Sequence, residues 1–143
     1  MEKMFIKDYN LHIGDKQKDY VIDMGLIDVV CTECFTINLK FDNGKQAYLH
    51  LEDIHSDEEF NQLAEKLCKF ANFYRISSAV IINLENLCEA ELDEQPNETG
   101  YYSLKLRFKR MRGGVASKNL EGQKRALEEI LEAKRNYDET VVE

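Results

Sequence analysis

Two stretches of alternating apolar and polar residues meet at Asp42-Asn43-Gly44, and this hairpin signal constrains the fold more than any other feature. From residue 29 to residue 41 the odd positions are apolar except Glu33, which is typical of a strand with one dry face. A three-residue turn at 42–44 gathers the apolar residues of both strands on one face. The predicted pairs are Leu39–Ala47, Ile37–Leu49 and Phe35–Leu51.

Further strands are expected where the same alternation recurs, at residues 5–13, 20–26, 80–92 and 102–108. In the second hairpin we expect Leu92 near Tyr102 and Ala90 near Leu104. A capping box of Ser56 and Glu59 predicts a helix that runs to about residue 75.

The C-terminal part contains a break and a second helix. Arg112-Gly113-Gly114 is expected to break the chain, and Ser117 to cap the last helix. We therefore predict a single α+β domain over residues 1–143. It has an antiparallel sheet of six to seven strands, one inserted helix and a C-terminal helix, with 138–143 as a frayed tail.

Composition excludes several classes of protein. The 143 residues are 43% hydrophobic, which argues against a disordered chain, and no apolar run reaches the roughly 20 residues of a membrane span. The first eight residues lack the apolar core of a signal peptide, so we expect a cytoplasmic protein with reduced thiols and no membrane contact.

Neither metal nor catalytic motifs stand out. Cys31 and Cys34 form a CxxC, but on one strand they would point to opposite faces, and Cys68 and Cys88 do not complete a two-pair pattern. We expect small buried thiols apart from a surface thiol at Cys34, with no metal and no cofactor; a zinc site, or one at His50, Asp53 and His55, is the alternative. No nucleophile elbow, phosphate loop or dinucleotide fingerprint is present, so we name no catalytic residue and disfavour an enzyme.

Charge is distributed unevenly along the chain. There are 27 acidic and 19 basic residues, a net charge of −8, yet residues 76–104 hold six acids and no Lys or Arg. Residues 105–135 hold ten bases and four acids. The candidate site for an anionic partner is Lys105, Arg107, Lys109, Arg110 and Arg112. The candidate acidic surface is Glu85, Glu89, Glu91, Asp93 and Glu94, and the alternative is that the two groups neutralise each other on a solvent face.

From these patterns we expect a non-enzymatic binding or regulatory module that acts through its surface, such as an acidic inhibitor or adaptor of a partner protein. A narrow apolar stripe on the last helix allows docking on the sheet or pairing with a second copy, so a homo-oligomer is considered as well. A small-ligand-binding protein or an enzyme with a pocket on the sheet is the alternative. Nucleic-acid contact through residues 105–112 is third, because the negative net charge disfavours a nucleic-acid partner.

Overall fold

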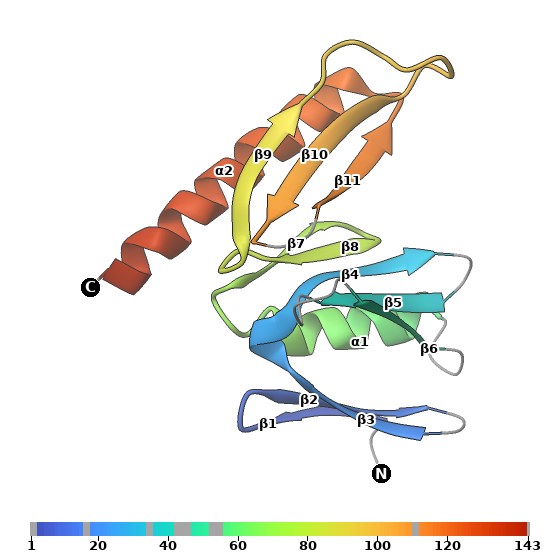
Figure 1. Cartoon of the computed structure of the whole chain (residues 1–143), viewed down its shortest axis with the longest axis vertical. Coiled ribbons are helices and arrows are strands. Elements are labelled where there is room, and N and C mark those ends of the chain that lie inside the picture. The colour runs from blue at the N-terminus through green and yellow to red at the C-terminus, as the bar shows by residue number, and fades with distance from the viewer. Residues whose placement is uncertain are drawn as a thin grey trace. The chain divides into compact units, whose positions relative to one another are not determined.

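The computed structural model describes residues 3–15, 18–33, 36–41, 47–51, 56–109 and 112–142 (Figure 1). These residues form strands, two α-helices and one 3₁₀ helix. The elements are β1 (Met4–Lys7), β2 (Asn10–Asp15), β3 (Lys18–Asp23), η1 (Met24–Leu26), β4 (Ile27–Glu33), β5 (Thr36–Phe41), β6 (Ala47–Leu51), α1 (Asp57–Leu67), β7 (Phe73–Ser77), β8 (Val80–Asn83), β9 (Leu87–Leu92), β10 (Tyr102–Phe108), β11 (Arg112–Ser117) and α2 (Leu120–Val142).

The α+β class is confirmed, with one helix between strands and one at the C-terminus. The described strands lie in three antiparallel sheets, in the orders β1-β2-β3, β6-β5-β4-β8-β7 and β11-β10-β9. The chain divides into two compact units, Met1–Asn83 and Leu84–Glu143, which we call unit 1 and unit 2. That the whole chain forms one domain stays a prediction.

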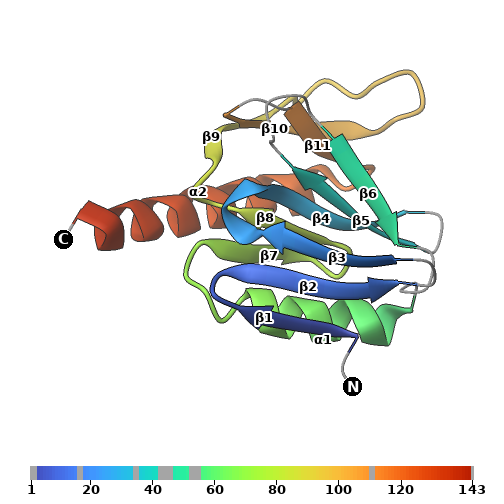
Figure 2. The ribbon, with the colours of Figure 1, turned by 60° about the horizontal axis from the view of Figure 1, so that its bottom comes forward.

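In unit 1, α1 packs between the first two sheets, and Figure 2 shows it running alongside β1 and β2. Its buried residues share one core with residues of both sheets, and they are Phe60, Leu63, Ala64 and Leu67. The capping box is confirmed: Ser56 Oγ accepts from the Glu59 backbone N–H at 3.1 Å and donates to Glu59 Oε1 at 3.1 Å. The rest of this core comes from alternate strand positions such as Leu11 and Ile13.

The predicted helix to residue 75 is wrong, because α1 ends at Leu67 and Phe73–Ser77 forms β7. The backbone of β7 forms hydrogen bonds with that of β8, and this pairing with a distant segment overrides the helical spacing of the apolar residues. The long predicted strands are also divided. The stretch 29–41 belongs to β4 and β5, which pair antiparallel with Glu33 opposite Thr36, and 80–92 is split by a turn at Leu84–Asn86 into β8 and β9.

Both predicted hairpin registers are wrong by two residues, although the strands pair as expected. Leu39 lies opposite Leu49 and not Ala47, and Leu104 lies opposite Leu92 and not Ala90. A slip of two keeps every side chain on its face, so alternation alone does not distinguish the two registers. The turn residues 42–46 lie outside the described residues.

In unit 2, α2 packs on one face of the β9–β10–β11 sheet. The core of this unit contains Leu104, Leu106 and Phe108 of β10 and Ile130 of α2. A buried glutamine joins the two elements, because Gln123 Nε2 donates to the carbonyl oxygens of Tyr102 at 3.0 Å and Val115 at 2.7 Å. Lys105 and Arg107 of β10 lie on the opposite face of this sheet, which α2 does not cover.

The helix α2 begins differently from the prediction. The side chain that caps it is Asn119, whose Oδ1 accepts from the Gly122 backbone N–H at 3.0 Å. Ser117 Oγ accepts from the Asn119 backbone N–H, two residues further along the chain and before the helix begins. The helix continues to Val142, through residues for which the sequence predicts a frayed tail.

Candidate functional site

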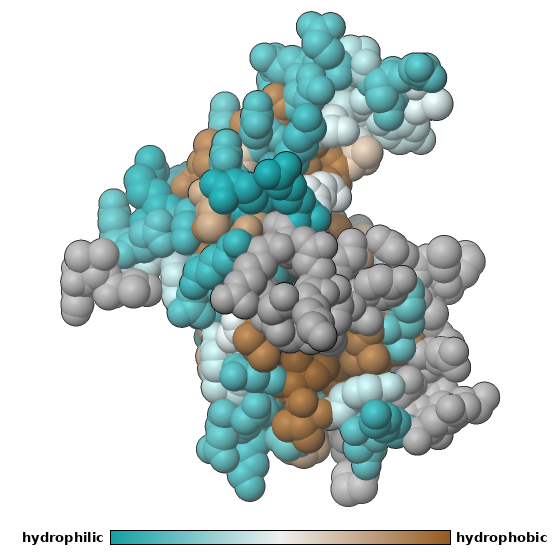
Figure 3. All heavy atoms as spheres, viewed as in Figure 1, coloured by the Kyte–Doolittle hydropathy of each residue, from teal (hydrophilic) through white to brown (hydrophobic). Residues whose placement is uncertain are grey.

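The outer face of the β9–β10–β11 sheet carries a row of charged side chains. Burial alternates along β10. Leu104 and Leu106 are buried on the face covered by α2, and the residue that follows each of them, Lys105 and Arg107, is exposed on the other face. In Figure 1 α2 lies behind this sheet, so its outer face is turned to the viewer. From the same direction Figure 3 shows mostly hydrophilic residues there.

Strand register places five of the charged residues together. Lys105 lies opposite Glu91, and Arg107 lies opposite Glu89 on one side and Arg112 on the other. A hollow of about 320 Å³ lies over this part of the face. It is lined by Glu89, Glu91, Lys105, Leu106, Arg107, Arg112 and Gly113.

Arg107 and Arg112 lie directly opposite each other on neighbouring strands of this face. Like charges directly across an antiparallel pair destabilise a sheet by a few tenths of a kcal/mol up to about 1 kcal/mol. Glu89 offsets part of this repulsion, since its Oε2 accepts from Arg107 Nε at 3.1 Å. Both side chains of that pair are about half exposed, so the attraction is screened by water. Two guanidinium groups at one end of a hollow form a site that suits an anion.

Gly114 lies beside the two arginines and brings β11 close to β10. A Cβ added to Gly114 would lie 2.9 Å from the Leu104 carbonyl oxygen, so β11 approaches β10 at this point more closely than a side chain allows. The prediction that Arg112-Gly113-Gly114 breaks the chain is wrong, because these residues begin β11. Glycines carry no alternation signal, and the sequence therefore gave no indication that Arg112 faces Arg107.

The other predicted site residues lie elsewhere. Lys109 is exposed just beyond β10, where its backbone N–H donates to the Asn86 carbonyl at 3.0 Å, and Arg110 lies outside the described residues. The predicted acidic surface is divided, since only Glu89 and Glu91 share the sheet face. Glu85 is exposed in the turn before β9, and the Asp93 carboxylate accepts from the Gln95 backbone N–H.

Glu94 is paired with a cation of α2 and does not contribute to the sheet face. Its carboxylate lies 3.3 Å from Lys124 Nζ, which also lies 3.7 Å from Glu121. The hydrogen bond to Glu94, together with the charge of Glu121, raises the pKa of Lys124. The acid and base of this pair balance each other away from the hollow.

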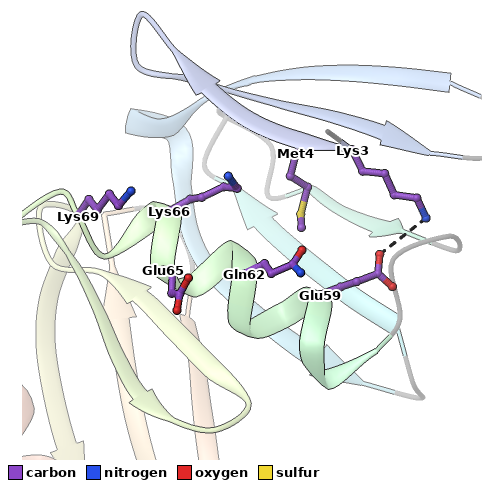
Figure 4. Close-up of a pocket in the computed structure, with 7 residues that line it drawn as sticks. All are labelled: Lys3, Met4, Glu59, Gln62, Glu65, Lys66 and Lys69. Atoms are coloured by element: carbon purple, nitrogen blue, oxygen red, sulfur yellow. Dashed lines mark ion pairs between the residues drawn. The ribbon is translucent and has the colours of Figure 1, made fainter. Parts of the chain in front are cut away.

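Unit 1 contains a second cavity, of about 420 Å³, between β1 and α1 (Figure 4). Lys3 and Glu59 approach each other across it at 3.8 Å, and Met4 lines it from β1. The remaining lining residues come from α1 and the turn after it, and they are Gln62, Glu65, Lys66 and Lys69. Three basic and two acidic side chains line it, the same balance as in the hollow of unit 2, and here Lys3 is paired with Glu59.

The described cysteines and histidines do not form a metal cluster. Among the residues that the structure describes, no group of three or more His, Cys, Asp or Glu side chains could hold a metal ion. Cys31 is buried, Cys68 and Cys88 are exposed, and partial desolvation raises the pKa of Cys68. Cys34, Asp53 and His55 lie outside the described residues. Neither described helix has the length and apolar composition needed to span a bilayer.

No protein-family model matches the chain, and no curated protein matches it. Among solved structures, the chain resembles the LytTr DNA-binding domain of a methyl-accepting/DNA response regulator from Bacillus cereus, with a TM-score of 0.50 and 11% sequence identity. The match covers 87% of this chain and 98% of that chain. At this identity the comparison shows a shared fold.

This similarity overturns two predictions made from the sequence. The main functional prediction, a non-enzymatic regulatory module for a partner protein, is wrong as a first choice, because a DNA-binding domain is built on this fold. The prediction that the charge disfavours a nucleic-acid partner is wrong for the same reason. It used the net charge of −8 for the whole chain, whereas the local face has three cations, Lys105, Arg107 and Arg112, against two carboxylates.

Proposed function

We propose that this chain is a DNA-binding domain whose contact surface is the outer face of the β9–β10–β11 sheet. The observation that carries the proposal is the opposition of Arg107 and Arg112 beside Lys105 on an exposed face. The similarity to the LytTr DNA-binding domain supports the choice of DNA among anionic partners. A cytoplasmic location, expected from the sequence, remains part of the proposal.

Arg112 and Lys105 have distinct expected roles in binding DNA. Arg112 lies opposite another arginine and has no carboxylate opposite it in the described register, so a phosphate would relieve its repulsion with Arg107. Lys105 supplies a third positive charge, two residues from Arg107 along β10. Gly114, on the same face as Arg112, carries no side chain that would hinder the approach of a phosphate to the arginines. With so few cations, affinity for DNA is expected to be modest and dependent on salt.

The test is the affinity of the full chain for a fluorescein-labelled 20-base-pair duplex, measured by fluorescence anisotropy between 50 and 200 mM salt. The double variant Lys105→Ala/Arg112→Ala is expected to bind at least about tenfold more weakly, and the slope of log K against log salt to fall by about 2. The matched control Arg125→Ala/Arg135→Ala removes the same charge from exposed positions of α2 and is expected to bind nearly as wild type.

Two results would contradict the proposal. One is a wild-type chain that binds no duplex at 50 mM salt. The other is an equal loss of affinity in the two double variants, which would show that only the total charge matters. Far-ultraviolet circular dichroism of each variant verifies that the changes at exposed positions leave the fold intact.

A further inference from the structure

The carboxylates on the proposed contact surface limit which part of a duplex it can face. Glu89 and Glu91 are exposed on the same face as the three cations. A carboxylate repels phosphate oxygens, and it can accept hydrogen bonds from amino groups on base edges in the major groove. The cytosine N4 amino group is the usual partner of glutamate there. On a surface that only bound the phosphate backbone, Glu89 would still offset part of the repulsion between Arg107 and Arg112, but both carboxylates would weaken phosphate binding.

The Glu89–Arg107 pair presents a hydrogen-bond acceptor beside a donor. Arg107 Nε lies 3.1 Å from Glu89 Oε2, and each side chain is about half exposed, so both groups have further hydrogen-bonding capacity toward solvent. A G·C base pair presents the complementary arrangement in the major groove, since guanine O6 is an acceptor next to the cytosine N4 donor. A T·A pair also presents an acceptor, thymine O4, beside a donor, adenine N6, but it lacks the adjacent N7 and O6 acceptors through which guanine binds an arginine or a lysine. The pair therefore matches the edge of one G·C pair.

The register repeats this arrangement along the sheet. Glu91 lies opposite Lys105, one side-chain position further along the same face of β9 and β10. Two residues of strand span about 6.8 Å, which is close to twice the rise of about 3.4 Å per base pair in B-DNA. The two acid–base pairs are thus spaced to meet base pairs that are two steps apart.

We propose that Glu89 with Arg107, and Glu91 with Lys105, are specificity-determining residues that recognise G·C pairs in the major groove of duplex DNA. This inference rests on the proposed function and deepens it. Arg112, which has no carboxylate opposite it in the described register, then serves phosphate contact, and the acid–base pairs serve sequence recognition.

The test compares three labelled duplexes of equal length and charge, one of G·C pairs, one of A·T pairs and one in which inosine replaces guanine. Inosine keeps the major-groove edge of guanine and lacks its minor-groove amino group. The wild-type chain is expected to bind the G·C and inosine duplexes about tenfold or more above the A·T duplex. Glu89→Gln is expected to reduce this preference severalfold with an unchanged salt slope, and Glu128→Gln on the exposed side of α2 serves as the matched control.

Three outcomes would overturn the inference while DNA binding stands. In the first, the wild-type chain binds the G·C and A·T duplexes equally. In the second, Glu89→Gln raises the affinity for both by the same factor, so that the carboxylate only repels phosphates. In the third, binding to the inosine duplex falls to the A·T level, which would place recognition in the minor groove. Failure to bind any duplex would instead remove the proposed function itself.

Discussion

The two three-stranded sheets, β1–β2–β3 of unit 1 and β9–β10–β11 of unit 2, share an architecture but differ on their outer faces. Each is an antiparallel meander with one face buried in a core. On the first, the central outer row is Phe5–His12–Val21, in which the Phe5 and His12 rings stack at 4.4 Å and Val21 is 63% exposed. On the second, the corresponding row is Glu89–Arg107–Arg112.

This difference shows that the strand framework does not decide what a face can bind. Strand pairing fixes which side chains stand next to one another, and the chemistry depends on which residues occupy those positions. The outer face of β1–β3 carries the stacked Phe5 and His12 rings, with exposed Lys7 and Asp23 in the neighbouring row, whereas the outer face of β9–β11 places Arg107 opposite Arg112. Of the two central rows, only the second places like charges directly opposite each other.

The largest effect is expected from changing adjacent residues on opposite faces of β10. Leu104 is fully buried, so Leu104→Ala should lower the free energy of unfolding by about 2–5 kcal/mol, through lost burial and the cavity that remains. Lys105→Ala on the outer face should change it by less than about 0.5 kcal/mol. Urea denaturation measures both. If both variants lost the same free energy of unfolding, the outer face would contribute to stability as much as the buried face, and the distinction between the two faces would be wrong.

An intermediate effect is expected at the helix that covers each sheet. The Gln123 side chain of α2 is buried and donates to two strand carbonyls, so Gln123→Leu should destabilise the chain by about 1–3 kcal/mol. Gln62→Leu on the exposed side of α1 is the control, with an expected change of less than about 0.5 kcal/mol. If thermal unfolding shows Gln123→Leu to be neutral, the two hydrogen bonds do not hold α2 on the sheet.

The smallest effect is expected from the strand glycines. Gly114→Ala places a Cβ 2.9 Å from the Leu104 carbonyl oxygen and should cost about 1–2 kcal/mol through displacement of β11. The Cβ of Gly14→Ala in β2 would lie 3.4 Å from the end of the Asp19 side chain and 3.8 Å from the Lys3 carbonyl oxygen, so this change should be neutral or slightly stabilising. Chemical denaturation of the two variants sharpens the comparison. A neutral Gly114→Ala would mean that the close approach of the two strands is not required.

The features that could be predicted from the sequence are those set by near neighbours. The Ser56 capping box depends on residues three positions apart, and the alternation in β10 depends on residues two apart, so both were visible. Likewise, Glu89 and Glu91 were correctly placed on one face with Lys105 and Arg107. These local rules hold whatever the rest of the chain does.

The features that could not be predicted depend on distant pairing. The apolar spacing of 70–74 continues that of α1, yet pairing with β8 makes a strand from Phe73 onward. The two hairpins slipped by two residues, since alternation is unchanged by such a slip. The central element of the candidate site, Arg112 opposite Arg107, was missed because a strand beginning Arg-Gly-Gly has no period-two pattern.

Locating the DNA contact on the protein tests the proposed DNA-binding surface most directly. Backbone amide chemical shifts of the ¹⁵N-labelled full chain should be followed by NMR during titration with a 20-base-pair duplex. We expect the largest shift changes at residues 103–107 and 112–116, and small changes across β1–β2–β3. Changes concentrated on β1–β2–β3, or on α2 with β10 and β11 unaffected, would contradict the assignment of the outer face of unit 2 as the DNA-binding surface.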